Sequence, residues 1–237
     1  MPGDIHVGSE RIVGSMPPVD PDATEHIPPV AASTYAKLAA SYGQPYYRSV
    51  AEDVAGLARP GDRVLDAGTG PGYLPVALAE RTADVRIHAF DVTRELLECG
   101  REEAARRGVD RRVSFFAGDC YAVPVRDRRY ALVTATGVLH ALEEPARALA
   151  EFHRVLEPAG TAWISDPAIL DAPENPDIEL TAHEREVFRA YGVRSADEER
   201  PLPTAEARRL AAESPFDDAT VEVGEPGDVR LRLSRRV

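Results

Sequence analysis

The chain has 237 residues, of which 43% are hydrophobic and 29% charged, and its formal net charge is −12. This composition is typical of a globular protein, and the acidic balance disfavours nucleic acid or an anionic membrane surface as a partner. Cys99 and Cys120 form no disulfide framework or zinc motif, and no apolar run reaches the roughly 18–20 residues of a membrane span. We therefore expect a cytoplasmic protein without a bound metal.

The N-terminal segment differs from the rest in composition. Residues 1–30 are polar and rich in proline, which predicts an arm or loop. The spacing of Tyr35 and Tyr42 then predicts a helix, and Gly-Gln-Pro at 43–45 is expected to end it.

The aromatic residues of this region, with Tyr46 and Tyr47, form either a lid over a flat substrate or ordinary packing. A capping box of Ser49 and Glu52 predicts the start of the next helix. We therefore divide the chain into an arm and lid helix, residues 1–45, and a main domain, residues 46–237.

From residue 63 onward apolar strands alternate with helices. Strands are predicted at 63–67, 85–90, 112–118, 130–136 and 160–166. Strands separated by helices in this way indicate parallel βαβ units. Further helices are predicted at 181–192, after a capping box, and at 204–214. Two strands around the Gly-Glu-Pro-Gly-Asp turn at 224–228 predict an antiparallel pair at one sheet edge.

A glycine loop joins the first of these strands to its helix. Gly68, Gly70 and Gly72 follow directly on Asp66, which indicates close approach of a ligand to the backbone. The dinucleotide pattern G-x-G-x-x-G fails because Tyr73 occupies the third glycine position, and a phosphate-binding P-loop fails because no lysine follows. The remaining pattern is D-x-G-x-G-x-G.

Two further acidic residues follow the next two strands. Asp91 lies about 20 residues beyond the loop, where a carboxylate can accept both hydroxyl groups of a ribose. Asp119 follows the third strand and could accept from the amine of adenine, with Val92 against the ring. The alternatives are that Asp91 caps a helix and that Asp119 belongs to a turn.

These motifs resemble those of the class I S-adenosylmethionine-dependent methyltransferases, in particular the small-molecule enzymes that include quinone and sterol methyltransferases. The stretches that carry the resemblance are VLDAGTGPG, HAFDVTRELL, VSFFAGDCYAVPV and the segment from Tyr130 to Asp166. The resemblance implies an α/β, Rossmann-like, doubly wound sheet of seven strands in the order 3-2-1-4-5-7-6, with the seventh antiparallel. The chain departs from the family at Ala159, which replaces a glycine in a turn.

The resemblance also implies roles for individual residues, with S-adenosylmethionine as cofactor and S-adenosylhomocysteine as product. Asp91 would hold the ribose, and the fourth strand end would line the sulfonium side. The residues implied at the cofactor are Tyr47, Asp66, Gly68, Thr69, Gly70, Gly72, Asp91, Val92, Asp119, Cys120, Thr136 and Gly137.

Two side chains near the fourth and fifth strand ends are candidate catalytic residues. His140 is suited to act as a base near neutral pH, and Asp166 lies before a proline. The alternatives are that His140 packs over the cofactor pocket and that Asp166 caps a turn.

The sequence therefore predicts methyl transfer from S-adenosylmethionine to a small-molecule acceptor, in secondary metabolism. One rival is an enzyme of the same fold that uses the sulfonium for a cyclisation, elimination or decarboxylation. The other is an NAD-dependent oxidoreductase, which Tyr73 disfavours. A homodimer is compatible with the sequence.

Overall fold

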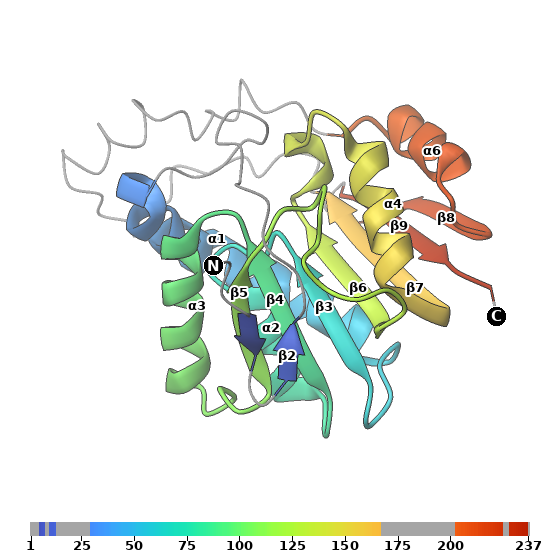
Figure 1. The fold of residues 1–237 in the computed structure, drawn as a ribbon. Helices are drawn as coiled ribbons and strands as arrows, with labels where there is room; N and C mark the ends of the chain where they lie inside the picture. The colour runs from blue at the N-terminus through green and yellow to red at the C-terminus, as the bar shows by residue number, and fades with distance from the viewer. Residues whose placement is uncertain (1–4, 8–9, 13–28, 167–201, 225–227, 237) are drawn as a thin grey trace.

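The computed structural model describes residues 5–7, 10–12, 29–166, 202–224 and 228–236, and its main feature is one sheet of seven strands (Figure 1). The strands lie in the order β5-β4-β3-β6-β7-β9-β8, and β9 is antiparallel to both neighbours. Numbered from β3, this is the predicted order 3-2-1-4-5-7-6 with an antiparallel seventh strand, so the fold prediction is confirmed. The strands are β3 (Arg63–Ala67), β4 (Arg86–Asp91), β5 (Val113–Ala117), β6 (Tyr130–Thr136), β7 (Leu156–Asp166), β8 (Asp218–Val223) and β9 (Val229–Ser234).

Helices cover both faces of this sheet, because each central strand buries side chains on both sides. Val64 belongs to a core cluster with residues of α1 and α2, whereas its neighbour Leu65 belongs to a second cluster with residues of α4 and α6. The helices are α1 (Pro29–Ala55), α2 (Tyr73–Arg81), α3 (Arg94–Arg106), the short 3₁₀ helix η1 (Leu139–Ala141), α4 (Pro145–Val155) and α6 (Thr204–Glu213).

The strand order reverses between β3 and β6. From β3 the chain builds outward through β4 to β5, and it then returns to place β6 on the other side of β3. In such sheets the loops at the carboxyl ends of these central strands diverge and leave a crevice between them. The loop after β3 and the segment after β6 therefore border the same edge of the sheet.

Helix α1 differs from the sequence prediction. It is continuous across the predicted break at 43–45 and contains Pro45, so Ser49 and Glu52 are interior residues and not an N-terminal capping box. Proline removes a helical hydrogen bond, but Pro45 is exposed and the helix is held on both sides of it. Ala36 packs with Leu96 of α3, and Val50 is buried in the main core.

Other differences lie at the chain ends. The arm predicted as loop contains a small antiparallel hairpin, β1 (Ile5–Val7) with β2 (Glu10–Ile12). The predicted helix at 181–192 lies outside the described residues. No helix in the described part of the chain is long and apolar enough to cross a membrane.

The turn that interrupts the pairing of β6 with β7 holds Ala159 in a left-handed conformation, with φ +63°. This conformation costs an L-residue about 1–2 kcal/mol, whereas glycine adopts it freely. The next residue, Gly160, must remain glycine because a Cβ atom there would lie 2.9 Å from the carbonyl oxygen of Glu157.

We therefore expect Ala159→Gly to raise the free energy of unfolding in urea by about 0.5–1 kcal/mol, the relief of strain less the added entropy of the unfolded chain. Ala105→Gly, at an exposed position in the last turn of α3, is the control and should lower it, by less than the roughly 1 kcal/mol of a helix-interior glycine. A lower stability for Ala159→Gly would contradict the assignment of strain to this turn.

Candidate functional site at the carboxyl edge of the sheet

The glycine loop bends sharply between β3 and α2. Gly68, Gly70 and Gly72 all have positive φ, at +64°, +53° and +76°. The backbone N–H of Thr69 donates to the carbonyl oxygen of Phe90 at 2.9 Å, and that of Gly70 donates to Asp91 Oδ2 at 2.8 Å. The loop is thereby bonded to the end of the neighbouring strand β4.

The three glycines exclude side chains for different reasons. A Cβ atom at Gly68 would lie 2.6 Å from Val138 Cγ2, and one at Gly72 would lie 2.7 Å from Phe115 Cε1. At Gly70 the nearest atom is Tyr35 Cε1, at an ordinary 3.8 Å. Gly68 and Gly72 are therefore required by internal packing, and only Gly70 leaves room for a ligand beside its backbone.

Asp91 accepts two backbone hydrogen bonds at the end of β4. Its Oδ2 takes the N–H of Gly70, and its Oδ1 takes the N–H of Thr93 at 2.8 Å, at the start of α3. Burial raises the pKa of Asp91, and these N–H groups oppose the shift. Asp91 therefore bonds the residue that precedes α3, and the helix itself, whose N-cap is Thr93, has no side-chain cap. A carboxylate can accept several hydrogen bonds at once, which makes Asp91 a candidate acceptor for a ligand hydroxyl group.

Asp66 lies on β3, two residues before the glycine loop. It is 2% exposed, and its Oδ1 accepts a 2.7 Å hydrogen bond from the hydroxyl group of Thr134 on β6. Burial raises the pKa of Asp66 to about 6, and the hydrogen bond from Thr134 opposes this shift. Asp66 therefore binds the two central strands together at the point where the sheet order reverses.

The segment after β5 contains a turn in which the carboxylate of Asp119 accepts one backbone hydrogen bond. Asp119 Oδ1 accepts from the N–H of Tyr121 at 2.8 Å, so the turn role considered for Asp119 is real, and its second oxygen has spare lone pairs. Cys120 is buried, and burial raises the pKa of its thiol, which stays protonated at neutral pH. Val92 is half-buried beside Asp91.

Strand β6 ends at Thr136, and the segment after it begins with Gly137. Gly137 has φ +66°, and its N–H donates to the carbonyl oxygen of Ser165 at 2.8 Å. This bond joins the ends of β6 and β7 and directs the chain into η1.

His140 and Asp166, predicted as separate candidates, form one pair. Asp166 Oδ1 is hydrogen-bonded to His140 Nδ1, and Asp166 Oδ2 accepts from the N–H of Leu139 at 3.0 Å. Asp166 is fully buried, whereas 17% of the His140 side chain is exposed. A carboxylate at Nδ1 favours the tautomer with hydrogen at that nitrogen, so Nε2 of the neutral ring is a proton acceptor.

A second polar network beside this pair was missed by the sequence analysis. The hydroxyl group of Ser165 donates to Asp228 Oδ2 at 2.8 Å, so the 2.6 Å bond between Tyr46 and Ser165 has Tyr46 as its donor. Arg230 Nε also donates to Asp228 Oδ2, at 2.7 Å. These contacts fix α1 to the ends of β7 and β9. No local pattern marks the bonds of Ser165, since Tyr46 and Asp228 are distant from it in sequence.

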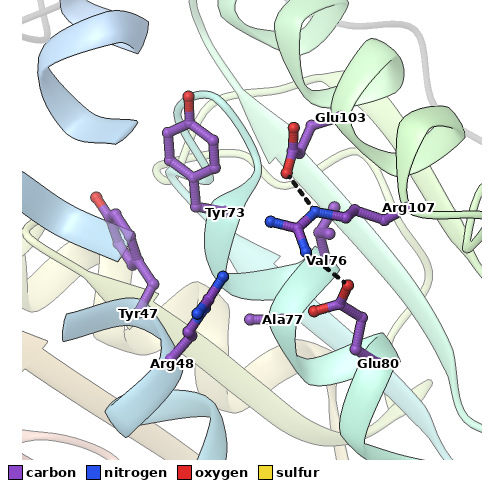
Figure 2. Close-up of a pocket in the computed structure, with 8 residues that line it drawn as sticks. All are labelled: Tyr47, Arg48, Tyr73, Val76, Ala77, Glu80, Glu103 and Arg107. Carbon is purple, nitrogen blue, oxygen red and sulfur yellow. Dashed lines mark hydrogen bonds and ion pairs between the residues drawn. The ribbon is translucent and has the colours of Figure 1, made fainter. Parts of the chain in front are cut away.

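Tyr47 is next to this network, with its ring 5.6 Å from that of Tyr46. It lines a small pocket between α1, α2 and α3, and its ring lies 6.0 Å from that of Tyr73 (Figure 2). In the same pocket Arg107 is paired with Glu103 and Glu80, at 3.0 and 3.3 Å. Burial raises the pKa of Tyr47, and the neighbouring groups Tyr35, Tyr46 and Asp66 add to the effect.

The comparisons with known proteins agree with this geometry. Residues 64–160 match a family model described as a methyltransferase domain. Over these residues the chain is therefore similar to methyltransferases, and its fold is that of the class I S-adenosylmethionine-dependent methyltransferases.

Three individual proteins illustrate the similarity. The demethylmenaquinone methyltransferase of Chlorobaculum parvum is 31% identical over 134 residues, which cover 55% of this chain and 52% of that protein. A solved structure from Methanococcus maripaludis has a TM-score of 0.70 at 20% identity and covers 90% of this chain and 95% of its own. The [4+2]-cyclase SpnF has a TM-score of 0.53 at 22% identity, over 80% and 82% of the two chains. The chain spans about half the length of the curated relatives it matches.

The raised pKa of Asp66 predicts a pH-dependent stability. Between the ordinary pKa of 3.8 and the folded value of about 6, the folded state holds more protons than the unfolded state. Its stability therefore falls as pH rises through this window. The cost at neutral pH is about 3 kcal/mol, from about 1.4 kcal/mol for each pKa unit.

Asp66→Asn removes this cost. Relative to the wild type, the stability of the variant should therefore rise between pH 4 and pH 7 by about 3 kcal/mol in urea unfolding. Effects of the substitution that do not depend on pH cancel in this comparison. Asp84→Asn, in an exposed turn, is the control and should show a flat difference. A flat difference for Asp66→Asn as well would refute the raised pKa.

Proposed function

We propose that the protein transfers the methyl group of S-adenosylmethionine to a small-molecule acceptor. The observation that carries this proposal is the contact between the glycine loop and the second strand. At Gly70 the nearest atom to an added Cβ is an ordinary 3.8 Å away, and the N–H of Gly70 donates at 2.8 Å to the Asp91 carboxylate, a group able to accept several hydrogen bonds. A ribose diol beside a short polar chain fits these groups.

We assign residues at this edge of the sheet to each part of the cofactor in turn. Asp91 would accept from the ribose hydroxyl groups, and the segment from Gly68 to Gly70 would face the methionine part. Val92, Asp119 and the backbone N–H of Cys120 would surround adenine. Thr136 and Gly137 would line the sulfonium side, and Tyr47 would reach the methionine part from α1.

When bound, the cofactor supplies a methyl group already activated by a positive sulfur. The protein's contribution is orientation, which can account for roughly 7–11 kcal/mol of the barrier. The fixed glycine loop and the strand ends provide this orientation. Because the groups around the loop are bonded to one another, they need little rearrangement when a ligand binds.

His140 is placed to remove a proton from the acceptor. Asp166 holds the ring through Nδ1, Nε2 would accept the proton, and the buried carboxylate would stabilise the imidazolium that results. An acceptor with an acidic hydroxyl or carbon would use this pair. Since several relatives act on demethylmenaquinone or related quinones by name, we infer a hydroxylated aromatic or quinone-like acceptor.

The same site could serve an enzyme of this fold that does not transfer the methyl group. The similarity to the cyclase SpnF keeps this alternative open. Release of S-adenosylhomocysteine during turnover distinguishes the two, because only methyl transfer produces it. An NAD-dependent reaction is disfavoured by Tyr73, which starts α2 and donates to the carbonyl oxygen of Ala36 at 2.9 Å. A cytoplasmic location, a role in secondary metabolism, a homodimer and a lid role for residues 1–45 stay predictions.

Asp91→Asn tests the cofactor site. The amide group must turn its NH₂ toward one of the two backbone N–H groups that Asp91 now accepts, and it also loses the charge. We expect calorimetry to show S-adenosylmethionine bound about 10–100-fold more weakly, as for a lost hydrogen bond to a charged group. Asp84→Asn should bind like the wild type. Equal affinities for the wild type and Asp91→Asn would place the ribose elsewhere.

His140→Gln tests the proposed base. Glutamine keeps a polar side chain but does not titrate near neutral pH. Turnover of a hydroxylated aromatic acceptor should fall about 10²–10⁴-fold, measured as S-adenosylhomocysteine released, while the affinity for S-adenosylmethionine stays the same. His153→Gln, on α4 against Phe216, is the matched control with normal turnover. Normal turnover in His140→Gln would leave that histidine a packing role only.

A further inference from the structure

The loop between β5 and β6 is held by a further set of hydrogen bonds. This loop, residues 118–127, carries Asp119 and Cys120 at its start. Its later part lies against α4, where Arg154 donates from both terminal nitrogens to the loop backbone. We call this stretch the β5–β6 loop.

Arg154 uses all five of its N–H groups. Its Nη1 atom donates to the carbonyl oxygen of Val125 at 2.9 Å and to Asp127 Oδ1 at 2.7 Å. Its Nη2 atom donates to the carbonyl oxygen of Val123 at 2.9 Å and to Glu151 Oε2 at 2.7 Å. Its Nε atom donates to Glu151 Oε1 at 2.8 Å. A lysine has three donors on one nitrogen and cannot reproduce this planar set.

Glu151 completes the arrangement. It accepts two bonds from Arg154 and also the backbone N–H of Val123 at 2.9 Å. The pair therefore satisfies both the N–H and the C=O of Val123, whose side chain is buried. Because a buried backbone group without a partner is costly, this part of the loop has few alternative positions.

The start of the loop is held by the other end of α4. The hydroxyl oxygen of Tyr121 accepts the N–H of Glu144 at 2.9 Å, and the guanidinium group of Arg147 lies 5.0 Å from the centre of the Tyr121 ring. The N–H of Tyr121 in turn donates to Asp119 Oδ1. Helix α4 thus holds the loop at two places that follow Asp119, at Tyr121 and over residues 123–127.

We propose that Arg154, together with Glu151, is a positioning residue that sets the specificity of this site for the adenine base. The inference rests on the proposed function, because it assigns the free oxygen of Asp119 to the 6-amino group of adenine. Arg154 acts through the loop and touches no ligand.

The physical consequence concerns discrimination more than affinity. A 6-amino group donates to the Asp119 carboxylate, whereas the 6-oxo group of hypoxanthine places an acceptor against it. A loop that cannot shift must leave two acceptors facing each other, and this rejects the 6-oxo base. A loosened loop can move away or admit water, so the loss of affinity for the 6-oxo base becomes smaller.

The test compares the dissociation constants of S-adenosylhomocysteine and S-inosylhomocysteine by calorimetry, in the full chain and in Arg154→Lys. We expect the wild type to prefer the adenine ligand and the preference ratio to fall about five- to tenfold in Arg154→Lys. Arg106→Lys, an exposed arginine of α3 whose side chain bonds Glu103, is the matched control with an unchanged ratio. Glu151→Gln repeats the test if Arg154→Lys does not fold.

A general structural role would weaken both ligands by the same factor. An unchanged ratio in folded Arg154→Lys or Glu151→Gln therefore overturns the inference. Failure of the wild type to bind S-adenosylhomocysteine at all has a different meaning, because it overturns the proposed function and this inference with it. The two failures are distinguished by the wild-type titration alone.

Discussion

The candidate site depends on one hydrogen bond, from the backbone N–H of Gly70 to the carboxylate of Asp91. It forms only if Gly70 takes its left-handed conformation and if β3 and β4 pair in the observed register, Asp66 with Ala89. The second carboxylate oxygen accepts from Thr93 at the start of α3. One side chain therefore joins the glycine loop, the second strand and a helix N-terminus.

This arrangement buries acidic groups, and removing their charges from water costs electrostatic free energy. Asp66 and Asp91 both have raised pKa values, and the charge of Asp91 adds to the shift at Asp66. Backbone N–H groups and the hydroxyl group of Thr134 offset part of this cost. The result is a site built of carboxylates and polarised backbone groups, which suits hydroxyl and amine donors on a ligand better than phosphate.

Local patterns in the sequence were sufficient for the parallel βαβ units, the glycine loop and the acids at the strand ends, whereas the sheet order was predicted from the family resemblance. The predicted helix end at residues 43–45 was wrong, because α1 packs against the protein on both sides of Pro45 and this outweighs the local preference for a break. Local patterns also could not pair His140 with Asp166 or find Ser165 and Asp228, since these contacts join residues that only the fold brings together. The need for Gly68 and Gly72 was predicted, but the main reason is packing against Val138 and Phe115.

The most direct test of the account is a crystal structure of the full chain with S-adenosylhomocysteine. The account predicts both ribose hydroxyl groups within hydrogen-bond distance of the Asp91 carboxylate, the amino-acid part along Gly68–Gly70 and the adenine amine beside Asp119. A ligand bound in the pocket between α1, α2 and α3, or a ribose that does not contact Asp91, would contradict it.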